Sequence, residues 1–171
     1  MPLTVCSDGG DDKQMRKGGR IPDALVQAIV FGWYDGVTDG VATSKGQRRS
    51  YRFQLLSWDA EQEMRVYSLT KLNTGSFKTI ANLLASIEPP HWPFWVVHWP
   101  EASERTKGLE AKLEPLLKSD SLPEFIIASR DVTRGIEHGR ALDSVQAKEE
   151  FLTLRHREAP FTEWLRFVEG Q

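Results

Sequence analysis

The chain has 171 residues, of which 40% are hydrophobic and 27% charged, and its formal net charge is -2. This length fits one domain with a sizeable core, since domains run to roughly 100–200 residues. Six Trp, eight Phe and three Tyr exclude global disorder, and the near-neutral charge excludes a nucleic-acid binder whose whole surface is basic.

The N-terminal segment has the composition of a tail. Glycines at 9, 10, 18 and 19 stand among charged residues, and few apolar residues accompany them. Such a segment buries too little apolar surface to offset the entropy cost of ordering. We therefore expect residues 1–20 to be a flexible tail and residues 21–171 to form a single globular domain.

The first half of the domain has the pattern of an antiparallel meander. Residues 24–34 are almost continuously apolar, which is typical of a buried strand. Asp35-Gly36 follows and predicts a hairpin, because a type I′ turn needs positive φ angles. Residues 51–55 alternate, so the apolar side chains of that strand share one face, and residues 65–72 form the next strand. We expect three or four strands here.

From residue 76 the apolar pattern takes the period of a helix. Ser76 is available as its N-cap, and Pro89-Pro90 ends it. The residues of its apolar stripe are Phe77, Ile80, Leu83, Leu84 and Ile87.

Two short strands flank a second helix. Residues 94–99 and 124–128 are apolar runs of strand length, and Ser103 can cap the helix between them. Pro115 predicts a kink or break of that helix at 111–114. The order strand, helix, strand gives a possible parallel βαβ unit, which would be right-handed.

Two closing helices complete the chain, one over residues 142–154 and one over 162–168 capped by Thr162. The elements together predict an α+β fold, a mixed sheet with helices mainly on one face.

The acidic turn after the first strand resembles a calcium loop only in part. Asp35 and Asp39 occupy loop positions 1 and 5, but Val37 stands at position 3 and Gly46 at position 12, where a bidentate glutamate is needed. The pattern favours turn chemistry, with a second turn or bulge at Asp39-Gly40. Asp35 and Asp39 remain weak candidates for a cation site.

Motifs for the common enzyme classes are absent from the sequence. It contains no H-E-x-x-H, G-x-S-x-G, P-loop or G-x-G-x-x-G pattern, and Cys6 is its only cysteine. Glu110-Ala111-Lys112 matches a nuclease motif by letters, but in a helix its acid and base lie about 200° apart. No cofactor is predicted, and a cytoplasmic location is expected, because neither a membrane-spanning run nor a signal peptide is seen.

A polar segment after the last predicted strand is a candidate anion site. Ligands of sheets with parallel strands tend to bind beyond the carboxyl ends of those strands, and guanidinium groups match carboxylate and phosphate geometry. The alternative is an ordinary surface loop whose arginines are neutralised by Asp131 and Glu137. The candidate residues are Arg130, Arg134, His138 and Arg140.

Aromatic residues give two further candidates. Trp92 and Trp99 flank prolines at the ends of a strand, so one of them can be an exposed interface anchor, with core packing as the alternative. Arginines at 48, 49 and 52 beside Tyr51 and Trp58 suggest base stacking. Adjacent strand residues face opposite ways, however, so nucleic-acid binding is disfavoured.

Two functions follow from these features. The favoured one is a non-enzymatic binding or accessory protein, a small bacterial-type interaction or immunity-like module acting through a protein interface. The alternative is an enzyme or ligand-binding protein for an anionic small molecule or phosphodiester. In that alternative the arginines of the 129–140 segment stabilise charge, and His138 is the acid or base.

Overall fold

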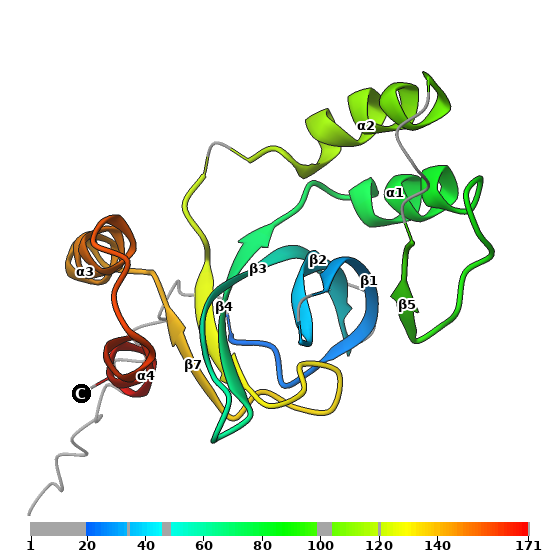
Figure 1. Cartoon of the computed structure of the whole chain (residues 1–171). Coiled ribbons are helices and arrows are strands. Elements are labelled where there is room, and N and C mark those ends of the chain that lie inside the picture. Colours follow the sequence, from blue (N-terminus) through cyan, green and yellow to red (C-terminus); the bar gives the residue numbers. More distant parts are fainter. Residues whose placement is uncertain (1–19, 34, 46–48, 99–103, 120, 171) are drawn as a thin grey trace, which may run out of the picture.

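The computed structural model describes residues 20–33, 35–45, 49–98, 104–119 and 121–170 (Figure 1). The expected tail, except Arg20, therefore lies outside the described residues, as do Trp99 and Ser103. The strands are β1 (Leu25–Trp33), β2 (Val37–Ser44), β3 (Ser50–Asp59), β4 (Met64–Lys71), β5 (Phe94–Val96), β6 (Phe125–Ser129) and β7 (His138–Ala141). The helices are α1 (Ser76–Leu84), α2 (Glu104–Leu117), α3 (Val145–His156) and α4 (Phe161–Glu169).

The strands form one seven-stranded sheet in the order β5-β1-β2-β3-β4-β6-β7. Strands β1 to β4 are the predicted antiparallel meander, and β6 pairs antiparallel with both β4 and β7. The short edge strand β5 runs parallel to β1. The sheet is therefore mixed, and the predicted α+β class is confirmed.

The possible βαβ unit is not formed by neighbouring strands. Strands β5 and β6 flank α2 in sequence, but β5 lies on the free edge of β1 and β6 on the free edge of β4. Both of those edges are left open by the meander, and each edge accepts one new strand. The length of the strand–helix–strand segment permits a crossover but does not say which edge the second strand joins.

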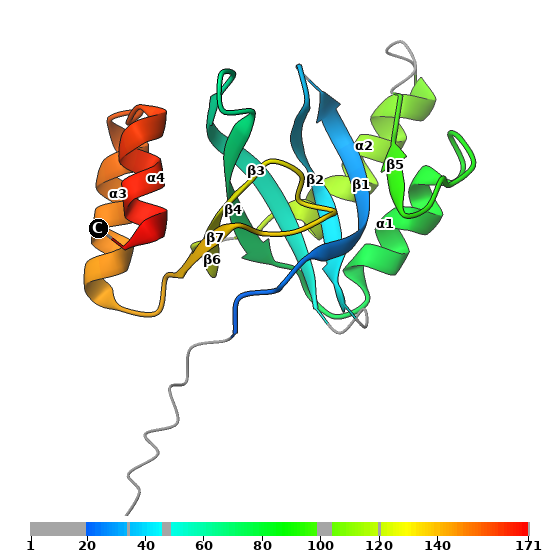
Figure 2. The same ribbon diagram turned by 90° about the horizontal axis from the view of Figure 1, so that it is seen from below.

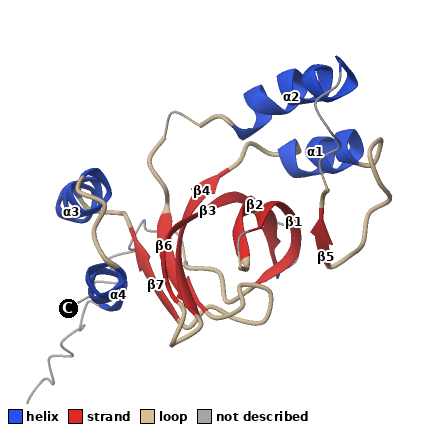
Figure 3. Cartoon of the chain, viewed as in Figure 1, coloured by secondary structure: helices blue, strands red, loops and turns tan. Residues whose placement is uncertain are grey.

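The sheet is strongly curled, and its helices lie on the convex side (Figure 1). Cross-strand partners share a face. One row of partners therefore lies on this face. The row pairs Ile29 with Val41, Val41 with Arg52, and Arg52 with Thr70. Helices α1 and α2 pack on its β1–β2 part, whereas α3 and α4 pack on its β4–β6 part (Figure 2). The prediction of helices mainly on one face is confirmed (Figure 3).

The concave face carries a core of aromatic rings. Tyr51 contacts Phe125 edge to face at 6.1 Å between ring centroids, and Phe53 contacts Tyr67 in the same way at 5.9 Å. Tyr51 and Phe53 are buried on the same side of β3, as the alternating pattern predicts. The loop after β6 closes this core, because Val132 is buried in it.

The start of β1 and the loop after β6 are joined by backbone hydrogen bonds. The amide of Leu25 donates to the carbonyl of Val132, and the amide of Ile136 donates to the carbonyl of Asp23, both at 3.2 Å. The start of the meander and the loop after β6 thus meet across the concave face (Figure 1). This closure fixes where the 130–137 loop lies.

Three predicted details of the helices differ from the structure. Helix α1 begins with buried Ser76 and is preceded by Gly75 at φ 85°, so the serine is not its cap. Helix α4 is preceded by Pro160, and Thr162 is its second residue. Helix α2 continues through Pro115, because a proline near the end of a helix removes only one of its last hydrogen bonds.

The remaining features of the helices follow from side-chain burial. The predicted stripe of α1 is confirmed for Ile80 and Leu84, which are fully buried against the sheet. The helix ends at Leu84, however, before Ile87 and the two prolines that were expected to end it. Helix α3 begins where the Ser144 hydroxyl accepts from the amide of Ala147 at 3.1 Å. Among the described ranges, no helix is long and apolar enough to cross a membrane.

Two glycines of the β1–β2 hairpin are needed for different reasons, Gly36 for its backbone angle and Gly40 for close packing. Asp35 and Gly36 have φ angles of 46° and 132°, so the predicted positive-φ turn is present. Asp39-Gly40 forms no second turn but lies inside β2, beside shifts in the β1–β2 register. A Cβ atom at residue 40 would lie 2.1 Å from the Ile29 carbonyl oxygen and 2.7 Å from the Phe53 ring.

Replacing Gly40 by alanine is therefore expected to destabilise the protein by about 1–3 kcal/mol or more, because backbone and ring must both move. Chemical denaturation followed by circular dichroism measures the change. Gly108→Ala is the matched control, since an added Cβ meets nothing within 4 Å there. In a helix that change stabilises by roughly 0.5–1 kcal/mol. Equal stability of both variants would contradict the tight packing at Gly40.

Candidate functional site

The tips of the β1–β2 and β3–β4 hairpins lie at the same end of the curled sheet (Figure 2). Two cavities of about 280 Å³ and 300 Å³ open there, and Arg65 and Arg130 line both. The 130–137 loop borders this end, since the Nε of Arg130 donates to the carbonyl of Gln62 at 3.2 Å. We call this end the mouth and define it by Trp33, Trp58, Arg65, Tyr67, Phe94 and Arg130.

Arg65 joins the two hairpin tips. It lies at the start of β4, opposite Trp58 of β3, and its guanidinium carbon is 5.7 Å from the centroid of the Trp58 ring. The same guanidinium donates a hydrogen bond to the backbone carbonyl of Asp35 in the β1–β2 turn. A cation is thus held between an aromatic face and a backbone oxygen at the centre of the mouth.

Tyr67 forms the inner wall of the mouth. Its hydroxyl donates to the carbonyl of Val37 at 2.9 Å, and its side chain is buried. Burial raises the pKa of Tyr67 to about 12, because the phenolate loses its hydration there; Arg65 lowers the pKa by less. The phenol therefore stays protonated near neutral pH and acts as a hydrogen-bond donor.

The outer rim of the mouth exposes large aromatic surface. Trp33 is 58% exposed at the end of β1, and Trp58 is 36% exposed near the end of β3. Charges of both signs surround them, since Asp35, Glu63 and Asp131 also line the two cavities. The mouth therefore combines exposed aromatic surface with charges of both signs.

No pattern in the sequence singles out this surface. Trp33 belongs to the apolar run that predicts a buried strand, and Trp58 is noted only for the disfavoured nucleic-acid interpretation. The available signal was position, because Trp33 and Trp58 each stand next to a turn of the meander and alternate turns lie at the same end. The curl of the sheet, which brings these turns to the 130–137 loop, carries no local signal.

Two of the predicted anion-binding residues lie on the 130–137 loop. Arg130 lines the mouth, and its guanidinium is 3.7 Å from the carboxylate of Glu137. Arg134 is 87% exposed and pairs with Asp131 at 3.4 Å. Both arginines are thus matched with the acids that the surface-loop interpretation named.

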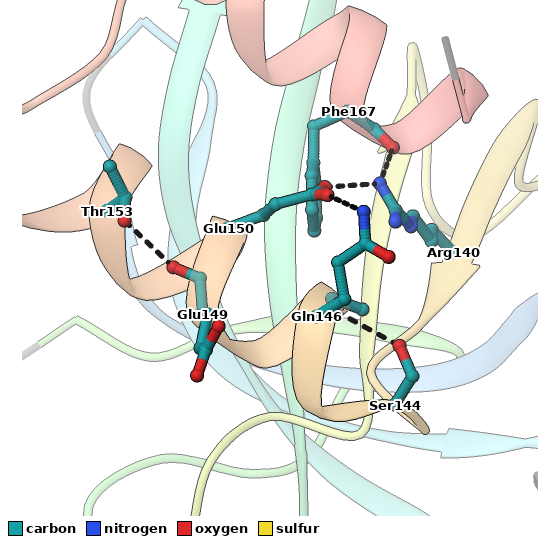
Figure 4. A network of polar contacts seen from close by, with 8 residues as sticks. Arg140, Ser144, Gln146, Glu149, Glu150, Thr153 and Phe167 are labelled. Atoms are coloured by element: carbon teal, nitrogen blue, oxygen red, sulfur yellow. Dashed lines mark hydrogen bonds and ion pairs between the residues drawn. The ribbon is translucent and has the colours of Figure 1, made fainter.

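The other two predicted residues project from β7 on the convex side, toward α3 and α4. His138 is 3.6 Å from the carboxylate of Glu169. Arg140 donates at 3.1 Å to the carboxylate of Glu150 and to the carbonyl of Phe167, and stacks 4.3 Å from the Phe167 ring (Figure 4). Arg140 therefore ties both C-terminal helices to the sheet, and each of the four candidates pairs with a different acid.

The interface candidate Trp92 is half-exposed beside β5. Its ring packs 5.9 Å from Phe77 and 5.7 Å from the buried Trp95, so it covers the end of α1 and presents one side to solvent. Trp99, the second candidate, lies outside the described residues. The prediction for Trp92 remains open.

The weak cation candidates lie on the β1–β2 hairpin. Asp35 is in the turn, whereas Asp39 is inside β2 and accepts from the Thr38 hydroxyl at 3.4 Å. Within the described ranges, no three His, Cys, Asp or Glu side chains are placed to hold a metal ion together.

Comparisons of the chain with models of protein families, with curated proteins and with solved structures find no match.

The role of Arg140 as a tie between helices and sheet predicts the effect of Arg140→Met. Loss of its charged hydrogen bonds is expected to destabilise the protein by about 1.5–3 kcal/mol, with faster amide exchange in α4. Chemical denaturation and hydrogen exchange measure both effects. Arg134→Met is the control and should change stability by less than about 0.5 kcal/mol. Similar stabilities for the two variants would refute the tie.

The raised pKa of Tyr67 predicts alkaline destabilisation. A tyrosine has a pKa of about 10 when unfolded. Its stabilising contribution is therefore complete below pH 10 and is lost as pH rises through 12. We expect the free energy of unfolding to fall by about 2 kcal/mol between pH 10 and 12 from this residue. Tyr67→Phe should reduce that fall, and urea unfolding at several pH values measures it. If the free energy of unfolding falls as steeply with pH in the variant, Tyr67 is not the source of the fall.

Proposed function

We propose that the protein is a non-enzymatic binding module, an interaction or immunity-like accessory protein, that engages another protein through the mouth. The observation that carries this proposal is Trp33, which leaves 58% of its surface exposed beside a cavity. Exposed Trp next to Arg is enriched among the residues that dominate binding energy.

The mouth suggests what such a partner presents. Trp33, Val37 and Phe94 line the cavity of about 280 Å³, so an apolar side chain of the partner can enter it. Arg65 and Arg130 flank the same cavity and retain donors for a carboxylate, because each guanidinium has five N–H groups. The proposed partner surface therefore combines an apolar anchor with an acidic group. A cytoplasmic location is proposed with it, since a single cysteine requires no oxidising compartment.

The alternative function has no supporting observation at the predicted loop. An enzyme or ligand-binding site for an anionic small molecule there needs His138 and at least two of the arginines around one cavity. Each of these side chains instead pairs with a different acid. We therefore propose only the binding function for this part of the molecule.

Photo-crosslinking in the source cells tests the proposal. The crosslinker p-benzoylphenylalanine replaces Trp33 or Trp58 in the full chain, and mass spectrometry identifies what is attached. We expect one protein from both positions, and we expect Arg65→Gln to remove it. Leu152 is the control position, because it is 46% exposed on α3, away from the mouth.

The affinities of variants for the identified protein then show which surface binds it. Trp33→Ala should weaken binding at least tenfold, since such anchors contribute about 2 kcal/mol or more. Leu152→Ala should leave it unchanged. A partner captured equally from Leu152, or captured from Trp92 alone, would show that the mouth is not the interface.

A further inference from the structure

A polar cavity of about 250 Å³ lies on the convex face, between the two pairs of helices. Its floor is the outer side of β3 and β4, and the chain between α2 and β6 borders it. Helix α3 contributes one side chain from its last turn. The polar residues that line the cavity are Arg52, Gln54, Ser68, Thr70, Ser119, Ser121 and Arg155.

The charges among the described residues of the lining are of one sign. Arg52 and Arg155 both line the cavity, and no described Asp or Glu does. Neither guanidinium makes an ion pair with any acid in the described ranges. Arg52 donates one hydrogen bond, to the carbonyl of Leu117 at 3.1 Å, and its Nε is buried without an acceptor. The guanidinium carbon of Arg155 lies 6.0 Å from the centroid of the Phe151 ring.

Hydroxyl groups supply further donors. The hydroxyls of Ser119 and Ser121 are 2.6 Å apart, and that of Ser68 is 3.5 Å from the carbonyl of Gln54. The side chain of Thr70 is nearly buried on the floor. A hydroxyl can turn its proton toward a bound acceptor, so the cavity can offer several hydrogen bonds to one ligand.

Packing alone does not account for these residues. On either side of the cavity the same convex face is apolar, with Val41 toward α1 and Val66 toward α4. A buried guanidinium donor without an acceptor costs about 1–3 kcal/mol or more, which an apolar side chain would avoid. The guanidinium groups of Arg52 and Arg155 are explained if a bound anion accepts their hydrogen bonds.

Three acids of the described ranges lie in neighbouring parts of the fold and do not line the cavity. Glu110 and Glu114 line a separate cavity on the α2 side of Arg52. Glu124 precedes β6, and its Oε2 atom is buried without a hydrogen-bond partner. These acids moderate the local potential, but none of them forms an ion pair with Arg52 or Arg155.

We propose that this cavity is a binding site for the phosphoryl group of a small molecule. Two guanidinium groups match a dianion, and surrounding hydroxyls suit a group with several acceptor oxygens. The volume of about 250 Å³ is below that of drug-sized ligand pockets, which begin at roughly 300 Å³, so a phosphate with a few attached atoms fits. The site is independent of the mouth, which opens from the concave face.

Nuclear magnetic resonance of the full chain tests the site with inorganic phosphate as the probe. Phosphate is titrated against sodium chloride at constant ionic strength while the Nε–H signals of the arginines are followed. We expect saturable shifts of Arg52 and Arg155 and of the amides of Ser119 and Ser121. Sodium acetate, the carboxylate arm, should shift the same signals more weakly.

Matched variants locate the binding. Arg155→Gln should weaken phosphate binding about tenfold or more, since a charge-assisted hydrogen bond is lost. Arg155 is exposed, so this variant should keep the fold. Its melting temperature in sodium chloride is the control for folding. Arg134→Gln removes the same charge from the 130–137 loop and should leave phosphate binding unchanged.

Each of the following results would overturn the proposal. Shifts that do not saturate, or that chloride reproduces, exclude a site. Equal affinity of Arg155→Gln and the parent chain places the phosphate elsewhere, and loss of binding in Arg134→Gln places it on the loop. Tighter binding of acetate than of phosphate would show that the cavity binds a carboxylate and not a phosphoryl group. None of these results bears on protein binding at the mouth.

Discussion

The packing of aromatic rings inside the curl of the sheet is the constraint on which the rest of the structure depends. The Phe53 ring lies against Gly40 and meets Tyr67 edge to face, while Tyr51 meets Phe125. Rings of this size fill the concave face only if the strands bend around them and the chain closes over the top. The closure is made by Val132, and it brings the 130–137 loop to the hairpin tips that form the mouth.

The convex face follows from the same curl. A strongly bent sheet spreads its outer side chains apart, so one layer of helices cannot cover the whole surface. Helices α1 and α2 form one apolar cluster with the sheet, and α3 and α4 form another. The strip between them is the polar cavity around Arg52, and Arg140 holds the second helix pair in place. Both proposed binding regions are therefore consequences of one bent sheet.

Arginines show how position in the fold decides chemistry. Arg140 is hydrogen-bonded to two helices, and Arg130 lies at the mouth beside Glu137. Arg155 faces a cavity that no described acid lines. In the sequence Arg130 and Arg140 are equivalent, because both follow the last predicted strand. The alternation of β7 turns Arg140 to the convex side, whereas Arg130 stands in the loop before that strand. No sequence pattern singles out Arg155, which is an ordinary charged residue near the end of a helix.

The sequence by itself determined the α+β class, the meander, the positive-φ turn at Asp35-Gly36 and the buried face of β3. These features depend on local periodicity and on the conformations that single residues allow. Only the tertiary structure decided that β5 and β6 join opposite parts of the sheet, that Trp33 and Trp58 meet at one mouth, and that Arg52 and Arg155 share a cavity. The physical reason is that edge choice and curl depend on contacts between residues far apart in the chain, which no local pattern records.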